Sequence, residues 1–338
     1  MKKMISRAVA LILVAALFTA VAYAMPSTSA KSHILMDADT GRVLSAKQEH
    51  SRSLIASTTK IMTAVVVLEQ CDITDQIVVS PEAVGIEGSS LYLKAGERMS
   101  ISDLLYGMML HSGNDAAVAL AIACSGSVLK FVDTMNSRAE ELGLEHTHFE
   151  NPNGLDGKEH YSTAYDLALL TRYALKLPHF QEIVSKKEVK IGNRALRNHN
   201  RLLWMMDGII GVKTGYTKAA GRILVSAARQ NGRTLIAVTI CDGNDWHDHM
   251  QLFSFGYSLY ERRRIISSGQ IIGRLPIMDG SVASLLSMED HFAYVMENEM
   301  ISVIIRYPRI ALDAQGIVFA DVYIGNLCVD TLQLKWEK

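Results

Sequence analysis

Two apolar segments joined by an Asn-Gly step constrain the fold of this chain more than any other feature. Residues 222–230 (RILVSAARQ) and 234–241 (TLIAVTIC) flank Asn231-Gly232. Because Asn and Gly tolerate the positive φ of a two-residue hairpin turn, the step predicts two antiparallel strands. A further strand is predicted just before them, at IIGVKTGYT (209–217), and a helix just after them, at about 247–262. An antiparallel sheet is therefore expected late in the chain.

Strand patterns also occur early in the chain, and helical patterns lie between. The stretch HILMDADTGRVLSAK (33–47) is typical of a hairpin that turns at Asp39-Thr40-Gly41. Helices are predicted at 57–69, at LLYGMML after a cap at Ser102-Asp103, at AAVALAIA (116–123), at 128–142 and at 163–176. Strands at both ends of a helical middle favour an α+β fold, in which one antiparallel sheet flanked by helices gathers both ends.

The pattern changes again from about residue 268. Short strands punctuated by glycine are predicted at 269–277, 301–307, 317–326 and 331–336. They indicate a small all-β C-terminal domain. The expected organisation is a signal peptide (1–24), a linker (25–32), a main domain (33–265) and the β-rich domain (266–338).

The first residues have the composition of an export signal. Lys2, Lys3 and Arg7 precede an almost wholly apolar run (8–21), and Ala22-Tyr23-Ala24 has the small-x-small pattern of a cleavage site. The alternative is a membrane anchor that is retained. Either way the protein is expected to act outside the cytoplasm, in the cell wall, in the periplasm or as a secreted protein.

Composition excludes several classes of function. The 338 residues carry 34 basic and 35 acidic side chains, which argues against nucleic-acid binding. The four cysteines, Cys71, Cys124, Cys241 and Cys328, form no CxxC pair, and their spacing does not say whether any of them form disulfides. The pairs His146/His148 and His247/His249 lack metal-site spacing and a third ligand, so no metal and no cofactor are expected.

The first of three candidate catalytic motifs is Ser57-Thr58-Thr59-Lys60. On a helix, residues three positions apart share a face, so the Ser57 hydroxyl and the Lys60 amine would meet. A lysine whose pKa is lowered can take the proton of a serine and make it a nucleophile. The pattern alone is weak, since Ser127-Val128-Leu129-Lys130 matches it too without another catalytic feature nearby.

The second and third motifs are Ser112-Gly113-Asn114 and Lys213-Thr214-Gly215. In the second, the serine can relay a proton and the Asn114 amide can bind a carbonyl, although a helix C-cap followed by an N-cap has the same residues. In the third, a glycine in a strand admits close approach of a substrate backbone, and the lysine and threonine can bind a carboxylate.

The three motifs, in this order, are those of the penicillin-interacting serine enzymes. The stretches IASTTKIMTA, LLYGMMLHSGNDAA, THFENPNGLDGKEHYSTAYDLALL and GVKTGYTKAAGRILVSA resemble the low-molecular-mass D-alanyl-D-alanine carboxypeptidases. The resemblance covers about residues 30–260 and, more weakly, the β-rich tail. It implies a β-lactamase/transpeptidase-like domain followed by a small all-β domain.

The resemblance also implies roles for individual residues. Ser57 would be acylated after Lys60 takes its proton, and Ser112 and Asn114 would complete the proton network, with Ser112 supplying a proton to the leaving amine. The implied substrate is the peptidoglycan stem pentapeptide ending in D-Ala-D-Ala, and β-lactams would acylate the same serine.

Substrate binding is implied for the third motif. The terminal carboxylate would lie near Lys213 and Thr214, beside Gly215, and the oxyanion hole would be formed by the backbone N–H groups of Ser57 and Tyr216. Asn198-His199-Asn200 is a further candidate for the lining of the cleft, and HYSTAYD (160–166) for a helix N-terminus.

Two alternative functions share these motifs. A class A-like β-lactamase needs a Glu followed four residues later by Asn, whereas Glu150 is followed by Gly154. The second alternative is a non-catalytic wall-binding module that retains the fold. Because all residues of the three motifs are present, nothing in the sequence indicates an inactive site. The final TLQLKWEK reads as a strand and not as an amphipathic helix, so it gives no support for membrane association unless the signal segment is retained.

Overall fold

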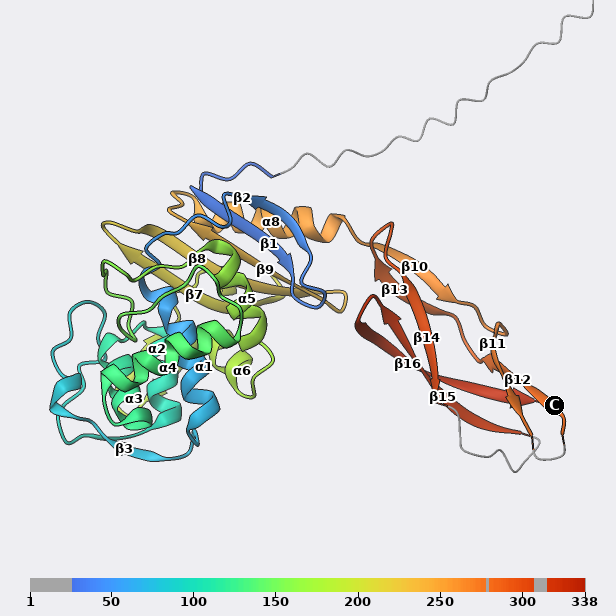
Figure 1. Ribbon diagram of the computed structural model, residues 1–338, viewed down its shortest axis with the longest axis horizontal. Helices are drawn as coiled ribbons and strands as arrows, with labels where there is room; N and C mark the ends of the chain where they lie inside the picture. The colour runs from blue at the N-terminus through green and yellow to red at the C-terminus, as the bar shows by residue number, and fades with distance from the viewer. Residues whose placement is uncertain (1–25, 278–279, 307–314, 338) are drawn as a thin grey trace, which may run out of the picture.

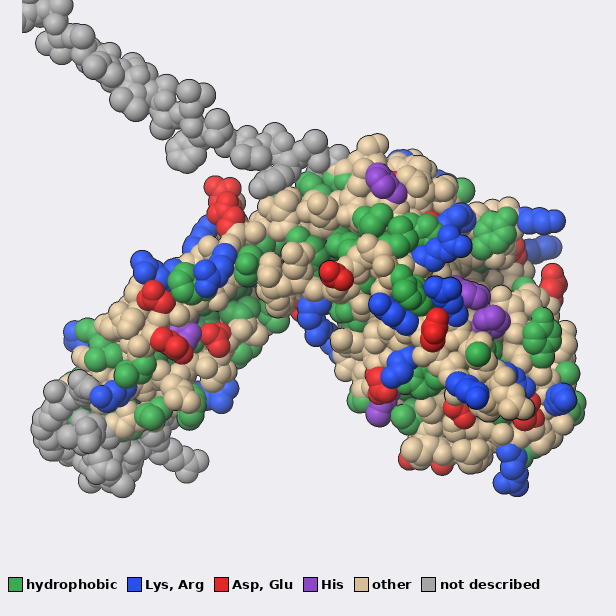
Figure 2. Space-filling model, turned by 180° about the vertical axis from the view of Figure 1, so that it is seen from behind, with side chains coloured by type: hydrophobic (Ala, Val, Ile, Leu, Met, Phe, Trp, Pro, Cys, Tyr) green, Lys and Arg blue, Asp and Glu red, His purple; other side chains and the backbone are tan. Residues whose placement is uncertain are grey.

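The computed structural model describes residues 26–277, 280–306 and 315–337. The predicted signal peptide (1–24) lies outside the described residues. Figure 1 shows two parts: an α/β part, in which helices surround a sheet, and an all-β part formed by the last strands. The parts touch at one end and leave a wide notch between them (Figure 2). The predicted α+β fold is confirmed.

The sheet of the α/β part has five antiparallel strands in the order β2-β1-β9-β8-β7. Their bounds are Ser32–Asp37 (β1), Val43–Lys47 (β2), Ile209–Thr217 (β7), Gly221–Gln230 (β8) and Arg233–Ile240 (β9). The hairpin at Asn231-Gly232 is confirmed, since β8 and β9 pair up to Gln230 opposite Arg233. The blue β1 lies beside the late strand β9 in Figure 1, so the sheet gathers both ends of this part as predicted.

Helices cover both faces of this sheet. They are α1 (Lys60–Gln70), α2 (Ile101–Leu110), α3 (Asn114–Ser125), α4 (Val128–Glu141), α5 (Ala164–Ala174), α6 (Phe180–Ser185), α7 (Leu202–Met205) and α8 (Asp245–Ser258). Alternate residues of β1 face opposite sides, as in any strand. Ile34 and Met36 belong to the large core with α1–α6, whereas Leu35 packs in a smaller core with Phe253 of α8.

Two predicted helix limits were wrong. The N-cap of α2 is Ser100 and not Ser102, because the Ser100 hydroxyl accepts a hydrogen bond from the Asp103 backbone N–H at 3.0 Å. The helix predicted at 247–262 is α8, which begins at Asp245 and ends at Ser258. Residues after it leave the helix because β10 (Glu261–Ile266) pairs with β13 (His291–Val295).

Short elements that the sequence analysis did not predict complete the α/β part. They are the pair β3 (Gln76–Val78) and β4 (Arg98–Ser100), the hairpin β5 (Glu188–Ile191) and β6 (Arg194–Arg197), and the 3-10 helix η2 (Pro81–Ala83). The 3-10 helix η1 (Ala56–Thr59) is the first turn of the helix predicted at 57–69. The hairpin β5–β6 and α7 lie directly before the Lys213 strand in the chain.

The all-β part has a hydrophobic core of its own, which includes Leu285, Val322, Leu332 and Trp336. Besides the β10–β13 pair, it contains a sheet in the order β11-β12-β16-β15-β14. The bounds are Ile271–Pro276 (β11), Val282–Ser287 (β12), Ile301–Arg306 (β14), Gln315–Ile324 (β15) and Leu327–Glu337 (β16). The predicted strands of this region are therefore present, and the exact domain limits stay a prediction.

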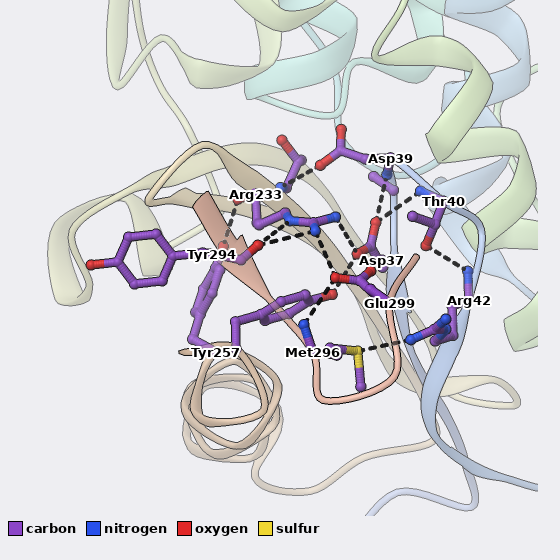
Figure 3. A network of polar contacts seen from close by, with 12 residues as sticks. Asp37, Asp39, Thr40, Arg42, Arg233, Tyr257, Tyr294, Met296 and Glu299 are labelled. Carbon is purple, nitrogen blue, oxygen red and sulfur yellow. Dashed lines mark hydrogen bonds and ion pairs between the residues drawn. The ribbon is translucent and has the colours of Figure 1, made fainter. Parts of the chain in front are cut away.

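A buried arginine connects the two parts. Figure 3 shows Arg233 of β9 between Asp37 of β1 and Glu299 and Tyr294 of the all-β part. Its guanidinium lies 2.8 Å from the Glu299 carboxylate and 3.5 Å from that of Asp37, and it donates to the Tyr294 carbonyl oxygen at 3.1 Å. The parts are thus joined by an ionic contact as well as by the chain.

Within the described residues no single helix is long and apolar enough to cross a bilayer. Among the described helices, only α3 and α4 taken together have the length and hydropathy of a membrane span, and they are bent by 86° at their junction.

Candidate active site

Ser57 lies in η1, which runs directly into α1. Lys60 is the first residue of α1, one turn after Ser57, and its Nζ donates a hydrogen bond to Ser57 Oγ at 2.9 Å. The Lys60 side chain is fully buried, whereas Ser57 is half-buried and lines an open cleft. The predicted meeting of this serine and this lysine is therefore present.

The break between α2 and α3 brings the second motif to the same place. Asn114 Oδ1 accepts a hydrogen bond from Lys60 Nζ at 2.6 Å. The Asn114 backbone N–H donates to the Ser89 carbonyl at 2.7 Å, and Asn114 Nδ2 donates to the Glu87 carbonyl. Ser112 adopts a positive φ of 66° and lines the cleft with Ser57. Anchored in this way, the amide of Asn114 holds the lysine amine in place.

The third motif lies on β7, the edge strand of the sheet. Within the described residues no strand pairs with its outer edge, so its backbone can bind an extended peptide there. Gly215 faces η1 so closely that a Cβ would lie 3.3 Å from the Ser57 nitrogen. The Lys213 side chain is buried, and its Nζ donates to the Thr214 carbonyl at 3.0 Å.

Asn153 and Gly154 are part of the site, although the sequence analysis gave them no role. The Asn153 carbonyl accepts a third hydrogen bond from Lys60 Nζ. Gly154 has a φ of +87°, and a Cβ there would lie 2.0 Å from the Ala56 carbonyl oxygen. Only a glycine lets this loop pack against the turn that carries Ser57. The positive φ could not be read from the stretch NPNGLDG without the tertiary contact.

A chain of hydrogen bonds supports the same turn from behind. His160 Nδ1 accepts from the Glu150 backbone N–H at 3.0 Å, which leaves Nε2 to donate to Thr59 Oγ1 at 2.7 Å. Thr59 in turn donates to the Ala56 carbonyl at 2.8 Å. Burial lowers the pKa of His160 to about 4, so its ring is neutral at pH 7.

Two buried amines determine the electrostatics of the site. Burial, and secondarily the charge of Lys213, lowers the pKa of Lys60 well below its usual value, against an opposing effect of Asp115. Burial lowers the pKa of Lys213 to about 7. Two ammonium groups in one dry site repel each other, so the pair favours a state in which one amine is neutral.

The cleft has a volume of about 470 Å³. Of the predicted residues, Ser57, Ser112, His199, Thr214, Gly215 and Tyr216 line it, whereas Lys60, Asn114 and Lys213 are buried. Sequence reasoning missed five further lining residues, Ser89, Arg222, Ile223, Asp245 and Trp246. Arg222 pairs with Asp245 and lies 5.7 Å from the Trp246 ring centroid, but no local pattern in the sequence relates these residues.

The other candidate residues have structural positions. Ser127, from the second SxxK match, caps α4 by accepting from the Lys130 backbone N–H. Thr163 caps α5 by accepting from the Asp166 backbone N–H at 3.0 Å, which confirms the predicted helix N-terminus. His249 is buried and contacts the hydroxyls of Ser226 and Thr239.

Comparison with known proteins agrees with this geometry. Residues 19–244 match the Peptidase S11 family, D-alanyl-D-alanine carboxypeptidase. The D-alanyl-D-alanine carboxypeptidase DacF of Bacillus subtilis is 35% identical over 264 residues, which are 74% of this chain and 68% of DacF. DacD of Escherichia coli is 36% identical over 289 residues, or 80% of this chain and 74% of DacD.

A solved structure is similar along both parts of the chain. Penicillin binding protein 5 from Haemophilus influenzae superimposes with a TM-score of 0.70 at 27% identity. The superposition covers 93% of this chain and 98% of that protein, so the likeness includes the all-β part.

Proposed function

The chain belongs to the Peptidase S11 family of D-alanyl-D-alanine carboxypeptidases, and we propose that Ser57 is the residue that is acylated in the reaction of this family. The enzyme is a serine-type hydrolase that removes the terminal D-alanine from D-Ala-D-Ala peptides of peptidoglycan and binds β-lactams. The observation that carries the proposal is the 2.9 Å hydrogen bond between Lys60 Nζ and Ser57 Oγ, in a lysine whose side chain is fully buried.

Acylation starts with proton transfer from Ser57 to Lys60. Burial and the neighbouring charge of Lys213 lower the pKa of Lys60, so its amine can be neutral and act as a general base. The two N–H bonds of the neutral amine donate to Asn114 Oδ1 and to the Asn153 carbonyl, so the lone pair faces Ser57 and accepts the hydrogen bond of its hydroxyl. Ser57 Oγ then attacks the carbonyl between the two D-alanines, and Ser112 passes a proton to the leaving amine.

The strand β7 binds two groups of the scissile D-Ala-D-Ala dipeptide, its terminal carboxylate and the oxygen of its scissile carbonyl. The leaving D-alanine carboxylate binds near Lys213 and Thr214, and Thr214 lines the cleft. The backbone N–H groups of Ser57 and Tyr216 stabilise the tetrahedral oxyanion. Gly215 lies between them without a side chain, which keeps η1 and β7 close enough for both groups to serve one oxygen.

Water then hydrolyses the ester on Ser57 and returns the enzyme to its starting state. A β-lactam places its ring carbonyl where the D-Ala-D-Ala carbonyl lies and acylates Ser57. Turnover of that ester as in a class A β-lactamase is not favoured, because among the described residues Lys60 Nζ donates to the backbone carbonyl of Asn153 and to no carboxylate. The natural substrate within peptidoglycan is the stem pentapeptide.

The enzyme acts outside the cytoplasm, after export by the segment 1–24. A disulfide between Cys71 and Cys124 supports this location, since disulfides persist in oxidising compartments. It joins the C-terminal end of α1 to α3, the two helices that begin at Lys60 and Asn114.

The deciding experiment measures D-alanine release from diacetyl-L-Lys-D-Ala-D-Ala, together with covalent labelling by a fluorescent penicillin. Ser57→Ala is expected to abolish both. Ser127→Ala is the matched control: it removes the serine of the other SxxK match, so the stability falls by about 1 kcal/mol while both activities remain. Labelling or release that persists in Ser57→Ala would refute the assignment of the nucleophile.

A further inference from the structure

The peptide unit between Ala56 and Ser57 carries one of the two donors of the proposed oxyanion hole. It is a trans peptide, so its carbonyl and its N–H point in opposite directions. The Ser57 N–H can therefore face the cleft only while the Ala56 carbonyl points away from it. The unit is tightly confined, because added Cβ atoms at Gly154 and Gly215 would lie 3.0 Å and 3.3 Å from the Ser57 nitrogen.

The orientation of this peptide unit is held from behind the turn. Ala56 has a φ of +44°, which is unfavourable for alanine and persists only where the surroundings enforce it. The Ala56 carbonyl accepts a hydrogen bond from Thr59 Oγ1 at 2.8 Å, and Thr59 Oγ1 lies 2.7 Å from His160 Nε2. Both side chains are buried. Because water is excluded there, the two hydrogen bonds act on the carbonyl without competition from solvent.

A backbone amide determines the donor and acceptor roles along this chain. The Glu150 N–H, which can only donate, lies 3.0 Å from His160 Nδ1, so Nδ1 accepts and Nε2 carries the proton. His160 Nε2 therefore donates to Thr59 Oγ1, and the hydroxyl hydrogen is left for the Ala56 carbonyl. The Phe149 ring packs edge-on against the imidazole, with centroids 5.8 Å apart, and fixes its orientation. Both hydrogen bonds thus run in one direction, toward the Ala56 carbonyl.

The direction of the chain has a consequence for the donor on the other side of the peptide unit. Hydrogen bonds that follow one another in the same direction polarise and strengthen one another. A donor to an amide carbonyl draws electron density from the amide, so the N–H of that amide becomes a stronger donor. Here the amide is that of Ala56 and Ser57, and its N–H is the one that faces the developing oxyanion.

We propose, on the basis of the function proposed above, that His160 and Thr59 are positioning residues that direct the Ser57 N–H toward the oxyanion and strengthen it as a donor. Both side chains lie behind the turn and outside the lining of the cleft, so they act through the Ala56 carbonyl and not on the substrate. Their effect belongs to the transition state, in which charge develops on the carbonyl oxygen. Loss of either side chain should therefore lower kcat with little change in KM.

The experiment uses the intact exported protein and three measurements. They are the rate of acylation by penicillin, kcat and KM for D-alanine release, and the infrared stretch of the ester carbonyl in the penicilloyl enzyme. That stretch reports directly on the oxyanion hole, because stronger hydrogen bonds to the ester oxygen lower its wavenumber.

The first set of variants alters threonine hydroxyls. Thr59→Val keeps the shape of the side chain and should slow acylation and kcat about ten-fold, less than the loss of an entire oxyanion donor. Its carbonyl band should move to higher wavenumber. Thr59→Ser restores the hydroxyl and should rescue the rate and the band. Thr171→Val is the matched control, since it removes a buried hydroxyl that donates to the Leu167 carbonyl in α5, and it should change neither.

The second set of variants leaves the turn itself unaltered. The amide of His160→Gln can accept from the Glu150 N–H and donate to Thr59, whereas His160→Phe can do neither. His160→Phe should therefore reproduce the slower acylation and the band shift of Thr59→Val, and His160→Gln should keep the wild-type band. This pair decides the question if Thr59→Val does not fold.

A carbonyl band that stays in place in Thr59→Val and in His160→Phe would overturn this inference, whether or not the rates fall, because the oxyanion donor would then not depend on the chain. A shift of equal size in Thr171→Val would overturn it too. The proposed function would stand in both cases, since Ser57 would still be labelled. Absence of penicillin labelling and of D-alanine release in the wild type would refute the proposed function and this inference with it.

Discussion

Arg233 and Glu299 form an ion pair of 2.8 Å whose side chains are only 3% and 4% exposed, and the pair joins the α/β part to the all-β part (Figure 3). Removal of one member of a buried pair leaves the other charge without a partner. Asp37 lies 3.5 Å from the same guanidinium and can offset part of that loss.

Glu299→Gln should therefore lower the free energy of unfolding by about 3 kcal/mol. Asp290→Asn is the control, because its pair with Arg264 is exposed and should contribute little to stability. Thermal unfolding of the two variants measures the difference. Equal losses would show that the buried pair does not stabilise the contact between the parts.

The charge of Lys213 should control the pH dependence of acylation. Lys213→Gln removes a positive charge that lowers the pKa of Lys60, so the pKa of Lys60 should rise. Lys60 then loses its neutral form at a higher pH, and the acidic limb of the penicillin acylation rate should move to higher pH, along with a lower rate. Lys218→Gln, at an exposed position after the motif, should leave the limb in place. An acidic limb unchanged in Lys213→Gln would contradict the proposed role of Lys60.

The disulfide between Cys71 and Cys124 should stabilise the helices of the active site. Cys71→Ala/Cys124→Ala, or reduction of the wild type, should cost about 2–4 kcal/mol of stability. Replacement of the exposed free Cys241 and Cys328 by alanine should have little effect. Chemical unfolding with and without reductant measures this, and a wild type that is indifferent to reductant would disprove it.

Gly154→Ala should reduce activity through the position of Ser57. The added Cβ would lie 2.0 Å from the Ala56 carbonyl, so the turn must move, and a rate loss of about ten-fold or more is expected. Gly126→Ala separates this clash from backbone strain: Gly126 has a φ of +77° but open space around it, so only about 1 kcal/mol of stability should be lost. Equal D-alanine release by the two variants would argue against the steric explanation.

Burial of His249 should make the protein sensitive to acid. Burial lowers its pKa to about 3, whereas the unfolded state has a value near 6.5. Between these values the unfolded chain binds more protons, so stability should fall with decreasing pH from 6.5 to 3 by up to about 1.4 kcal/mol per pH unit from this residue. His249→Gln should be less stable at pH 7 but show a flatter dependence in urea unfolding at pH 7, 5 and 4. An unchanged slope would assign the acid sensitivity to other groups.

The sequence by itself predicted the parts of this protein that depend on local chemistry. Asn231-Gly232 determined a hairpin because those residues accept the turn conformation. The spacing of Ser57 and Lys60 placed both on one face of a helix, so their contact needed no tertiary information. The order of the three motifs identified the family.

Only the tertiary structure decided what depends on segments far apart in the chain. The Asn153 carbonyl reaches Lys60 because Gly154 can pack against Ala56. A pocket lined by His111, Arg197 and Trp204 exists because the β5–β6 hairpin and α7 lie next to the end of α2. Arg233 meets Glu299 across the two parts for the same reason. Contacts of this kind depend on packing and burial, which no spacing along the sequence encodes, and burial is also what lowers the pKa of Lys60 and of Lys213.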